Sequence, residues 1–460
     1  MNFADRGELD DFLRAHPEVQ LLEVLMPDMN GLLRCKRIQR REFASLFEGG
    51  FTVPVTVPFL GIRGDMYGGQ DQRVIGGDPD QLILPVAGTL APIPWVDSPT
   101  AQVLTGFATG DGRYAEMDPR APLLRVLERY RASGLSPVVA TELEFYLLED
   151  GDGPRPSPRL GRIPGTGERQ HGIQYCMADD LIECDAFLEA VRKACELQAV
   201  PLTAIHSEFS PGQWEINTHH EHDALLAGDH AMLLKRIIKG VARRHGLGAT
   251  FMAKPFADQG GSGLHIHASA YREDGRNVFA HDEATLPPTL TEPLRHAIGG
   301  LQATIDEAMA IFAPNPNSYR RFTPGAFAPA GRSWGYDHRE VALRVPASTE
   351  DNRRVEHRIA GADANPYFVL AAVLAGMHYG LEHGVAPDTP VQREMDLSRS
   401  EVSIPQRLDK ALELLRAGKV LPQYLGEAFI EAFATQRQGE SDLYHAQVPD
   451  LDYAWYLRAL

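Results

Sequence analysis

Apolar residues recur at helical spacing in several long segments of the chain, and short apolar runs lie between them. Residues 118–135, DPRAPLLRVLERYRASGL, have a proline near the start, apolar residues at helical spacing and a glycine close to the end. This pattern predicts a helix, because proline is tolerated in the first turn and glycine favours termination. The same spacing predicts helices at 8–15, 179–198, 223–245, 290–312, 366–383 and 406–416, and again after residue 423. A strand is predicted at 138–148.

The first part of the chain is dominated by predicted strands. In residues 19–38, VQLLEVLMPDMNGLLRCKRI, an apolar run meets a turn at 28–31 and a second, apolar and basic run follows. This order predicts a hairpin-like pair of strands. Residues 51–110 are rich in glycine and proline and contain short apolar runs. We therefore interpret residues 1–112 as a small mixed domain and 113–460 as a larger α+β region.

Charged residues interrupt strands that otherwise have a buried character. The stretch TELEFYLLE at 141–149 places Glu142 and Glu144 two residues apart, so both carboxylates point to one face of the strand. Other strand-like segments also carry unusual polar residues, namely Glu208 and Glu215 around a Pro-Gly turn, His265 with His267, and Glu356 with Arg358. The simplest interpretation is that each faces solvent on a half-exposed strand.

A second interpretation explains the doublets together. A bare buried carboxylate is too costly, so it must be paired, neutralised or bound to a cation. The doublets lie beside glycine-rich or Pro-Gly turns, where catalytic groups tend to collect. Carboxylates with one or two imidazoles suit Mg²⁺ or Mn²⁺ better than zinc. Two cations with about three protein ligands each would leave positions for phosphate oxygens and water.

Arginines follow the polar strands closely. They are Arg320, Arg321, Arg332, Arg339, Arg344, Arg353, Arg354 and Arg358. Solvated surface charge is one interpretation, and we expect it for Arg320 and Arg353. Guanidinium groups beside a carboxylate–metal cluster would also bind phosphate and a substrate carboxylate. Phosphoryl transfer is then the natural reaction class, without a P-loop because no GxxxxGK[ST] segment occurs.

Composition narrows the possible partners and compartment. The 460 residues are 43% hydrophobic and carry a net charge of −17, which argues against a nucleic-acid partner. The four cysteines form no CxxC pair, so a reduced, cytoplasmic setting is expected. The first residues do not resemble a secretory signal. The most apolar stretch, 367–381, is too short to span a bilayer, so no membrane association is expected.

Eight segments of the chain, in order, resemble the glutamine synthetase superfamily. They are PDMNGLLRCKRI (27–38), TLAPIPW (89–95), ELEFYLL (142–148), EFSPGQWEIN (208–217), KPFADQGGSGLHIH (254–267), NSYRRFTPG (317–325), REVALRVP (339–346) and VEHRIAGADANPY (355–367). The resemblance implies an N-terminal β-grasp domain at 1–112. It also implies a glutamine-synthetase-type catalytic domain at 113–460, whose antiparallel sheet forms the active-site funnel.

The resemblance implies roles for individual residues. The first metal would be held by Glu144, Glu208 and Glu215, and the second, near the nucleotide phosphates, by Glu142, His265 and Glu356. Arg321 and Arg358 match arginines that bind the glutamate carboxylates, with Gly261 nearby, and Arg339 and Arg344 match those facing the phosphates. His267, Ser269, Arg344 and Arg354 are assigned to the nucleotide site, and Arg321, Arg339 and Arg344 are assigned catalytic roles.

The implied reaction has two steps and uses ATP, glutamate and an amine with Mg²⁺ or Mn²⁺. The γ-carboxylate of glutamate attacks the γ-phosphorus of ATP, and an amine then displaces phosphate from the acyl phosphate. Ammonia-using members carry a glutamate in the flap after Pro-Gly, whereas this chain has Phe327 there. Phenylalanine cannot accept a proton, but it can cover the alkyl part of a larger amine. The chain is most similar to the γ-glutamylpolyamine synthetase branch, which joins glutamate to putrescine or related amines.

Two other functions stay open. A true glutamine synthetase could use another acid, such as Asp65 in the segment FLGIRGDMYGG (59–69), to bind ammonium. A non-catalytic family member would serve as a structural or regulatory assembly, although the complete ligand set speaks against it. The resemblance also implies a homododecamer of two stacked hexameric rings, and a monomer in light scattering would contradict this.

Overall fold

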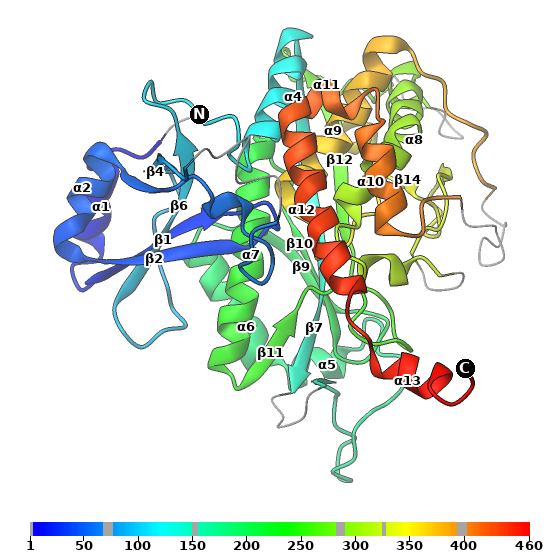
Figure 1. Ribbon diagram of the computed structural model, residues 1–460, viewed down its shortest axis with the longest axis horizontal. Helices are drawn as coiled ribbons and strands as arrows, with labels where there is room; N and C mark the ends of the chain where they lie inside the picture. Colours follow the sequence, from blue (N-terminus) through cyan, green and yellow to red (C-terminus); the bar gives the residue numbers. More distant parts are fainter. Residues whose placement is uncertain (1–2, 68–76, 150–154, 282–289, 324–327, 393–402) are drawn as a thin grey trace.

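The protein contains two β-sheets with helices around them (Figure 1). The computed structural model describes residues 3–67, 77–149, 155–281, 290–323, 328–392 and 403–460. A six-stranded sheet is built from residues up to Ala108, and a nine-stranded sheet is built from Leu135 onward. The predicted α+β class is therefore confirmed.

The six-stranded sheet has the order β2-β1-β6-β4-β3, with β5 beside β6. Its strands are β1 (Leu21–Pro27), β2 (Leu33–Gln39), β3 (Phe51–Pro54), β4 (Asp80–Pro85), β5 (Ala91–Pro92) and β6 (Thr100–Ala108), and α1 (Arg6–Ala15) and α2 (Phe43–Gly49) accompany them. The predicted hairpin is confirmed, since β1 and β2 are antiparallel. Its turn is stabilised by the Asp28 carboxylate, which accepts hydrogen bonds from the backbone N–H groups of Asn30 (2.9 Å) and Leu32 (2.8 Å).

The nine-stranded sheet has the order β13-β14-β15-β12-β7-β10-β9, with β8 and β11 also paired to β7. Its strands are β7 (Leu135–Glu149), β8 (Ser157–Pro158), β9 (Leu202–Ser207), β10 (Gln213–Thr218), β11 (Leu247–Thr250), β12 (Leu264–Arg272), β13 (Trp334–Tyr336), β14 (Leu343–Val345) and β15 (Val355–His357). All neighbouring pairs are antiparallel except β13–β14. The long strand β7 is central, so residues far apart in sequence meet along it.

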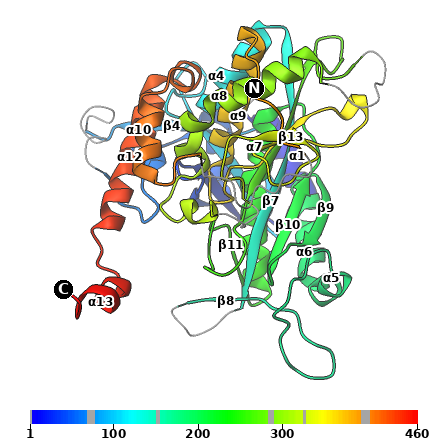
Figure 2. The ribbon, with the colours of Figure 1, turned by 90° about the vertical axis from the view of Figure 1, so that its right-hand side faces the viewer.

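Helices cover one face of this sheet and extend beyond it (Figures 1 and 2). The α-helices are α4 (Ala121–Ala132), α5 (Ala178–Glu183), α6 (Asp185–Leu197), α7 (Ala224–Arg244), α8 (Glu292–Phe312), α9 (Pro366–His383), α10 (Leu408–Arg416), α11 (Leu421–Leu425), α12 (Glu427–His445) and α13 (Asp450–Tyr456). Short 3₁₀ turns lie at Arg40–Glu42, Val57–Phe59, Ser318–Arg321 and Glu350–Asn352. Helices α4 and α7 contact β7, and α9 contacts β12. Among the described residues, no helix has the length and apolar character needed to cross a membrane.

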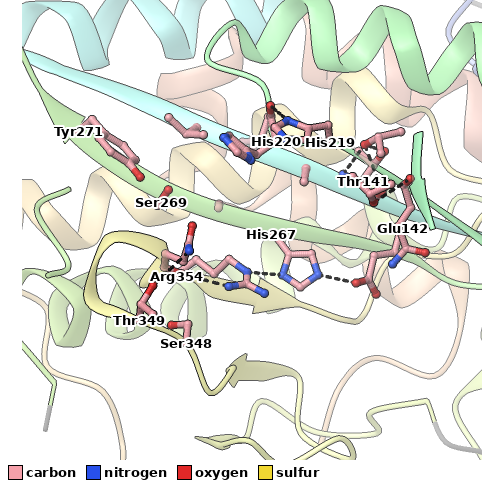
Figure 3. Close-up of a pocket in the computed structure, with 18 of the residues that line it drawn as sticks. Thr141, Glu142, His219, His220, His267, Ser269, Tyr271, Ser348, Thr349 and Arg354 are labelled. Atoms are coloured by element: carbon pink, nitrogen blue, oxygen red, sulfur yellow. Dashed lines mark hydrogen bonds and ion pairs between the residues drawn. The ribbon is translucent and has the colours of Figure 1, made fainter. Parts of the chain in front are cut away.

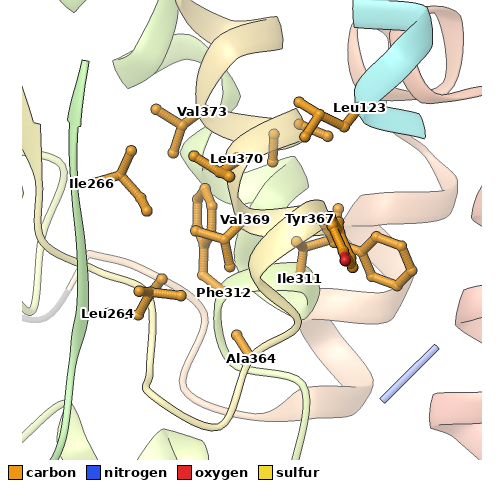
Figure 4. Packing of buried hydrophobic residues seen from close by; sticks show 14 of the residues in the cluster. Leu123, Leu264, Ile266, Ile311, Phe312, Ala364, Tyr367, Val369, Leu370 and Val373 are labelled. Carbon is orange, nitrogen blue, oxygen red and sulfur yellow. The ribbon is translucent and has the colours of Figure 1, made fainter. Parts of the chain in front are cut away.

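The core determines which strand face is left for polar groups. Leu264 and Ile266 of β12 are fully buried and lie near Phe312 of α8 and Leu370 of α9 (Figure 4). Residues between them on β12 must point to the other face, because side chains alternate along a strand. The same alternation buries Leu143 in the core of β7. The odd and even positions of these two strands therefore have separate functions, packing on one face and polar chemistry on the other.

Apart from shifts of a few residues at helix ends, the structure differs from the predicted helices at α2, at α11 and near Cys184. The single helix predicted at 179–198 is two helices, α5 and α6, because the backbone at Cys184 leaves helical geometry. Helix α2 was not predicted at all. It has seven residues, which is too short for a clear helical period, and its Phe43 and Leu46 are buried in the small-sheet core. Tertiary burial stabilises such a short helix more than its own sequence pattern does.

Candidate active site

Neighbouring strands of the large sheet bring the predicted polar residues together. The antiparallel register places His265 of β12 opposite Glu142 of β7, and Glu215 of β10 opposite Glu144 of β7. His267 of β12 lies opposite Glu356 of β15. Directly opposed side chains on one face of a sheet have Cβ atoms about 5 Å apart. The doublets found in the sequence are therefore combined into one continuous polar face.

His265 lies at the centre of this face. Its Nδ1 is 3.1 Å from a carboxylate oxygen of Glu142 and 3.9 Å from one of Glu356. Its Nε2 is 3.6 Å from a carboxylate oxygen of Glu144. His265, Glu144 and Glu356 are all buried, whereas the Glu142 side chain is 20% exposed. One imidazole thus joins carboxylates from two neighbouring strands.

A further group lies beside it on β9 and β10. His206 Nε2 is 3.4 Å from Glu208 and 3.7 Å from Glu215. The Glu208 carboxylate also accepts a hydrogen bond from the backbone N–H of Phe209 at 2.8 Å. His206 was not predicted, although it lies two residues before Glu208 and so has the same doublet spacing as the other pairs. That spacing was the signal that could have identified it.

The geometry is compatible with bound cations. Three groups each place their ligand atoms within 4.8 Å of one another, and they are Glu142–His265–Glu356, Glu144–Glu215–His265 and His206–Glu208–Glu215. The donor set is mainly carboxylate oxygen, which Mg²⁺ and Mn²⁺ prefer. The groups share His265 and Glu215, so the ions they would hold lie next to each other. The fit of these residues to two neighbouring divalent cations is good.

Arginines surround the Glu356 end of this face. Arg344 Nη1 donates to Glu356 at 2.8 Å and its Nη2 to Asp337 at 2.5 Å, while Arg358 pairs with the other Glu356 oxygen. Arg321 is buried and donates from Nη1 to the carbonyl of Ile359 at 2.9 Å. Within the described chain, the Nε atoms of Arg321, Arg344 and Arg358 are buried without a hydrogen-bond partner. Each of these three guanidinium groups therefore keeps one N–H donor that no described protein group satisfies.

Two glycines keep room for Arg321. A Cβ on Gly261 would lie 2.5 Å from Arg321 Cγ, and a Cβ on Gly263 would lie 3.0 Å from Arg321 Nη2 and 2.9 Å from His265 Nε2. The carbonyl of Gly261 also accepts a hydrogen bond from Gln213 at 3.0 Å. Any side chain at these positions would displace the arginine, so the glycine-rich segment shapes the site through close approach.

A cavity of about 570 Å³ adjoins the Glu142 side of the cluster (Figure 3). Arg354 Nε donates to His267 Nδ1 at 3.0 Å, and His267 Nε2 lies 2.7 Å from Glu142. This arrangement leaves the proton of a neutral His267 on Nε2, where it is donated to the carboxylate. Ser269 and Tyr271 line the same wall from β12, and His219 and His220 lie across from them. The cavity is large enough for a small organic ligand.

Two predicted site residues, Arg339 and Asp65, lie apart from these groups. Arg339 is exposed and forms no ion pair with any residue in the described part of the chain. Asp65 lies in the loop after Val57–Phe59, where Arg63 is 3.6 Å away and the loop is held by a hydrogen bond from Ile62 N–H to Glu440. It belongs to neither the carboxylate groups nor the cavity. Phe327 lies outside the described residues.

The carboxylates fall into two electrostatic classes. Burial acts to raise the pKa of Glu142, but hydrogen bonds with His265 and His267 outweigh it and lower the pKa. Burial is likewise outweighed at Glu356, where the charge of Arg358 lowers the pKa to about 2. In contrast, burial raises the pKa of Glu144, and burial together with neighbouring carboxylates raises the pKa of Glu215. The Glu144–Glu215 side therefore lacks the positive charge that the Glu356 side already has.

This asymmetry predicts that metal binding releases protons. Glu144 and Glu215 retain protons above 4.5, the usual pKa of glutamate, and a cation must displace them. We expect the affinity for Mn²⁺ to rise with pH above that value, because the raised pKa makes protons compete with the metal. Calorimetric titration in buffers of different ionisation enthalpy measures the release, and Glu215→Gln should reduce it. Identical heats in all buffers would contradict the prediction.

Comparison with known proteins identifies the family. Residues 116–456 match the family model "Glutamine synthetase, catalytic domain". The chain is 36% identical over 459 residues to gamma-glutamylputrescine synthetase PuuA of Escherichia coli (strain K12), covering 98% of this chain and 94% of that protein. It is 34% identical to glutamate–isopropylamine ligase of Pseudomonas sp (83% and 82% covered) and 33% identical to glutamine synthetase of Pyrococcus abyssi (89% and 88% covered).

Solved structures agree with the sequence matches. A structure titled "Apo GmaS without ligand" superposes with a TM-score of 0.82 at 26% identity, covering 98% of this chain and 99% of that one. The "GmaS/ADP complex-Conformation 1" gives the same TM-score. The family model, the relatives and the folds all cover the region that carries the polar face. The chain therefore belongs to the glutamine synthetase family.

Proposed function

We propose that the protein is an ATP-dependent ligase that joins the γ-carboxylate of glutamate to an amine larger than ammonia, such as putrescine, another polyamine or an alkylamine. The observation that carries this proposal is the arrangement of the carboxylates and His265 in adjoining groups on one sheet face. The two relatives named for amine substrates, PuuA and glutamate–isopropylamine ligase, support the choice of a larger amine. Glutamine synthetases are also among the relatives, so ammonia is the alternative acceptor.

The carboxylate groups would hold two Mg²⁺ or Mn²⁺ ions. Glu142, His265 and Glu356, which form one of the three groups, would take one ion. The family resemblance assigns the other ion to Glu144, Glu208 and Glu215, which the structure divides between the other two groups. When bound, these ions neutralise the phosphate oxygens and polarise the γ-phosphorus. The Glu142 group lies beside the 570 Å³ cavity, which also contains His267, Ser269 and Arg354. We place the nucleotide there, with its phosphates toward Glu142.

The buried arginines would bind the acid substrate and the transferring group. Arg321 and Arg358 have unpartnered Nε atoms among the described residues and lie close to Glu144 and Glu356. Their fixed guanidinium groups can bind the carboxylates of glutamate and hold its γ-carboxylate in line with the phosphate. Arg344, already oriented by Asp337 and Glu356, offsets negative charge on the phosphoryl group. Arg339 would approach the phosphates from its exposed position.

The acceptor is tested by the amine dependence of phosphate release from ATP in the presence of glutamate and Mg²⁺. The amine panel contains ammonium, methylamine, ethanolamine, putrescine, cadaverine and spermidine. We expect turnover with the larger amines and little with ammonium, because Phe327 cannot take a proton from an ammonium ion. Phe327→Glu should shift the preference toward ammonium.

Each result of this assay has a distinct meaning. Efficient use of ammonium by the unaltered protein would show a divergent glutamine synthetase, and Asp65→Asn would then test the alternative acid. Lack of turnover with every amine, together with absent metal-dependent ADP binding in calorimetry, would indicate a non-catalytic family member. Turnover limited to diamines and polyamines would support the proposal in its most specific form.

A further inference from the structure

A second polar cavity lies away from the carboxylate groups. It has a volume of about 710 Å³ and runs between strand β2 of the small sheet and helix α7, with Trp95 on its wall. Seven basic side chains line it, two from β2 and five from α7, against a single carboxylate, Glu23. We call it the basic groove. None of its lining residues belongs to the carboxylate groups or to the cavity at Arg354.

Four of the basic side chains already have an anionic partner. Arg37 and Arg236 both pair with Glu23, so one carboxylate is shared by two guanidinium groups. Arg34 pairs with Asp28 at 2.8 Å, and Arg244 pairs with Asp97 at 2.7 Å on the surface. Of these contacts, Glu23–Arg236 joins the small sheet to α7, and each of the four basic side chains has a carboxylate partner.

The other three basic side chains of the groove have no anionic partner among the described residues. Lys235, Lys239 and Arg243 follow each other at four-residue intervals, which places them along one face of α7. Within the described residues, none of the three forms an ion pair. Lys235 is buried, and its Nζ donates to the carbonyl of Ala364 at 2.8 Å. Burial, reinforced by Lys239, lowers the pKa of Lys235 to about 7, whereas Lys239 and Arg243 are exposed.

This arrangement is unfavourable without a counter-charge. Like charges four residues apart destabilise a helix by about 0.2–0.5 kcal/mol per pair, and a buried ammonium without an anion costs more. It occurs in a chain with 62 acidic and only 45 basic side chains, so a general excess of positive charge does not explain it. We call Lys235, Lys239 and Arg243 the basic ladder; it lines one wall of the groove without an acidic partner among the described residues, and its Lys239 and Arg243 are exposed.

The spacing indicates the kind of ligand. Successive residues of the ladder are about 6 Å apart along the helix axis, at 1.5 Å per residue, and the three span about 12 Å. A single phosphate would meet two of the three cations, whereas two linked anionic groups would meet all of them. The indole of Trp95 lies close to α7, since a Cβ on Gly240 would be 2.5 Å from its ring, and Arg236 lies over the ring at 5.8 Å. The wall of the groove is therefore firmly positioned.

We propose that the basic groove binds a small polyanion that carries at least two closely spaced phosphate or carboxylate groups. Lys239 and Arg243 are its main ligands, with Lys235 at the inner end of the ladder. Charge-assisted hydrogen bonds from ammonium and guanidinium groups suit both kinds of oxyanion. The site is separate from the ligase chemistry, so the proposal does not depend on the identity of the amine.

The test is calorimetric titration of the full chain after removal of metal ions by a chelating resin, which leaves no dissolved chelator to compete. The probes are pyrophosphate, citrate and inorganic phosphate. We expect pyrophosphate or citrate to bind more tightly than inorganic phosphate. Comparing pyrophosphate with citrate then shows whether phosphate or carboxylate groups are preferred. In Lys239→Gln/Arg243→Gln the affinity should fall about tenfold or more, because charged hydrogen bonds are lost.

The matched control is Lys36→Gln, which removes a charge from the same strand as Arg37 but outside the groove. It should leave the affinity unchanged. If the heats of binding are too small to measure, thermal unfolding serves as a second measurement. The polyanion should raise the thermal midpoint of the unaltered protein, and the double variant should be at least as stable without ligand, since repulsion on α7 is reduced. Absence of binding, or equal binding by the double variant, would overturn the proposal.

Discussion

Replacing Glu356 with glutamine is expected to reduce turnover by at least about a hundredfold and to destabilise the protein by about 3 kcal/mol. Glu356 is 1% exposed and is bound by both Arg344 and Arg358, with His265 Nδ1 3.9 Å away. The neutral amide removes the counter-charge of two guanidinium groups at once, and it also removes a proposed metal ligand. Initial rates and denaturant unfolding measure the two effects separately.

Glu350→Gln is the matched control for this variant. Glu350 also pairs with an arginine, Arg353, at 2.5 Å, but it belongs to none of the three carboxylate groups. Its loss should leave turnover close to that of the unaltered protein. If Glu356→Gln retained full activity, or if both variants lost activity equally, Glu356 would have no special part in the site.

The close crossing of α8 and α9 predicts the largest effect on stability alone. A Cβ on Gly300 would lie 2.2 Å from the carbonyl oxygen of Gly376 and 2.4 Å from the nitrogen of Gly380. These contacts are with backbone atoms, which cannot rotate away as a side chain can. We expect Gly300→Ala to lower the free energy of unfolding by about 3 kcal/mol, because the two helices must separate. Denaturant unfolding followed by circular dichroism measures the change.

Gly49→Ala provides the comparison. Gly49 is the last residue of α2, it is exposed, and no atom lies within 4 Å of the position of its added Cβ. Alanine there should be neutral or stabilise the helix by up to about 1 kcal/mol, from its better helix propensity. A Gly300→Ala protein as stable as Gly49→Ala would show that the α8–α9 contact can adjust without loss.

Local patterns in the sequence were sufficient for most helices and for the central strands. The predicted helix at 366–383 has the same bounds as α9, and the one at 223–245 differs from α7 by one residue at each end. Strand β7 was predicted at 138–148 and extends over Leu135–Glu149. The failures, α2, α11 and the break at Cys184, concern short elements. Their stability depends on burial against distant residues, which periodicity does not report.

The comparisons confirm the predicted family and support the predicted ligase class. Several finer expectations stay predictions. They are the division at residue 112, the dodecamer, the roles of the individual site residues, and the part played by Phe327 in amine choice. The structure does bring the six predicted metal ligands near one another, in groups that also include His206.

Strand alternation in the sequence was enough to show that Glu142 and Glu144 share a face, and likewise His265 and His267, because the two-residue period is a property of the extended backbone. Only the tertiary structure decided which polar pair lies opposite which pair on a neighbouring strand. His265 lies opposite Glu142, and Glu215 opposite Glu144, through pairings between strands far apart in the chain. The same is true of the basic groove, whose walls come from the small sheet and from α7. Such contacts depend on how whole elements pack, and the packing free energy is shared among many buried residues rather than encoded in any one segment.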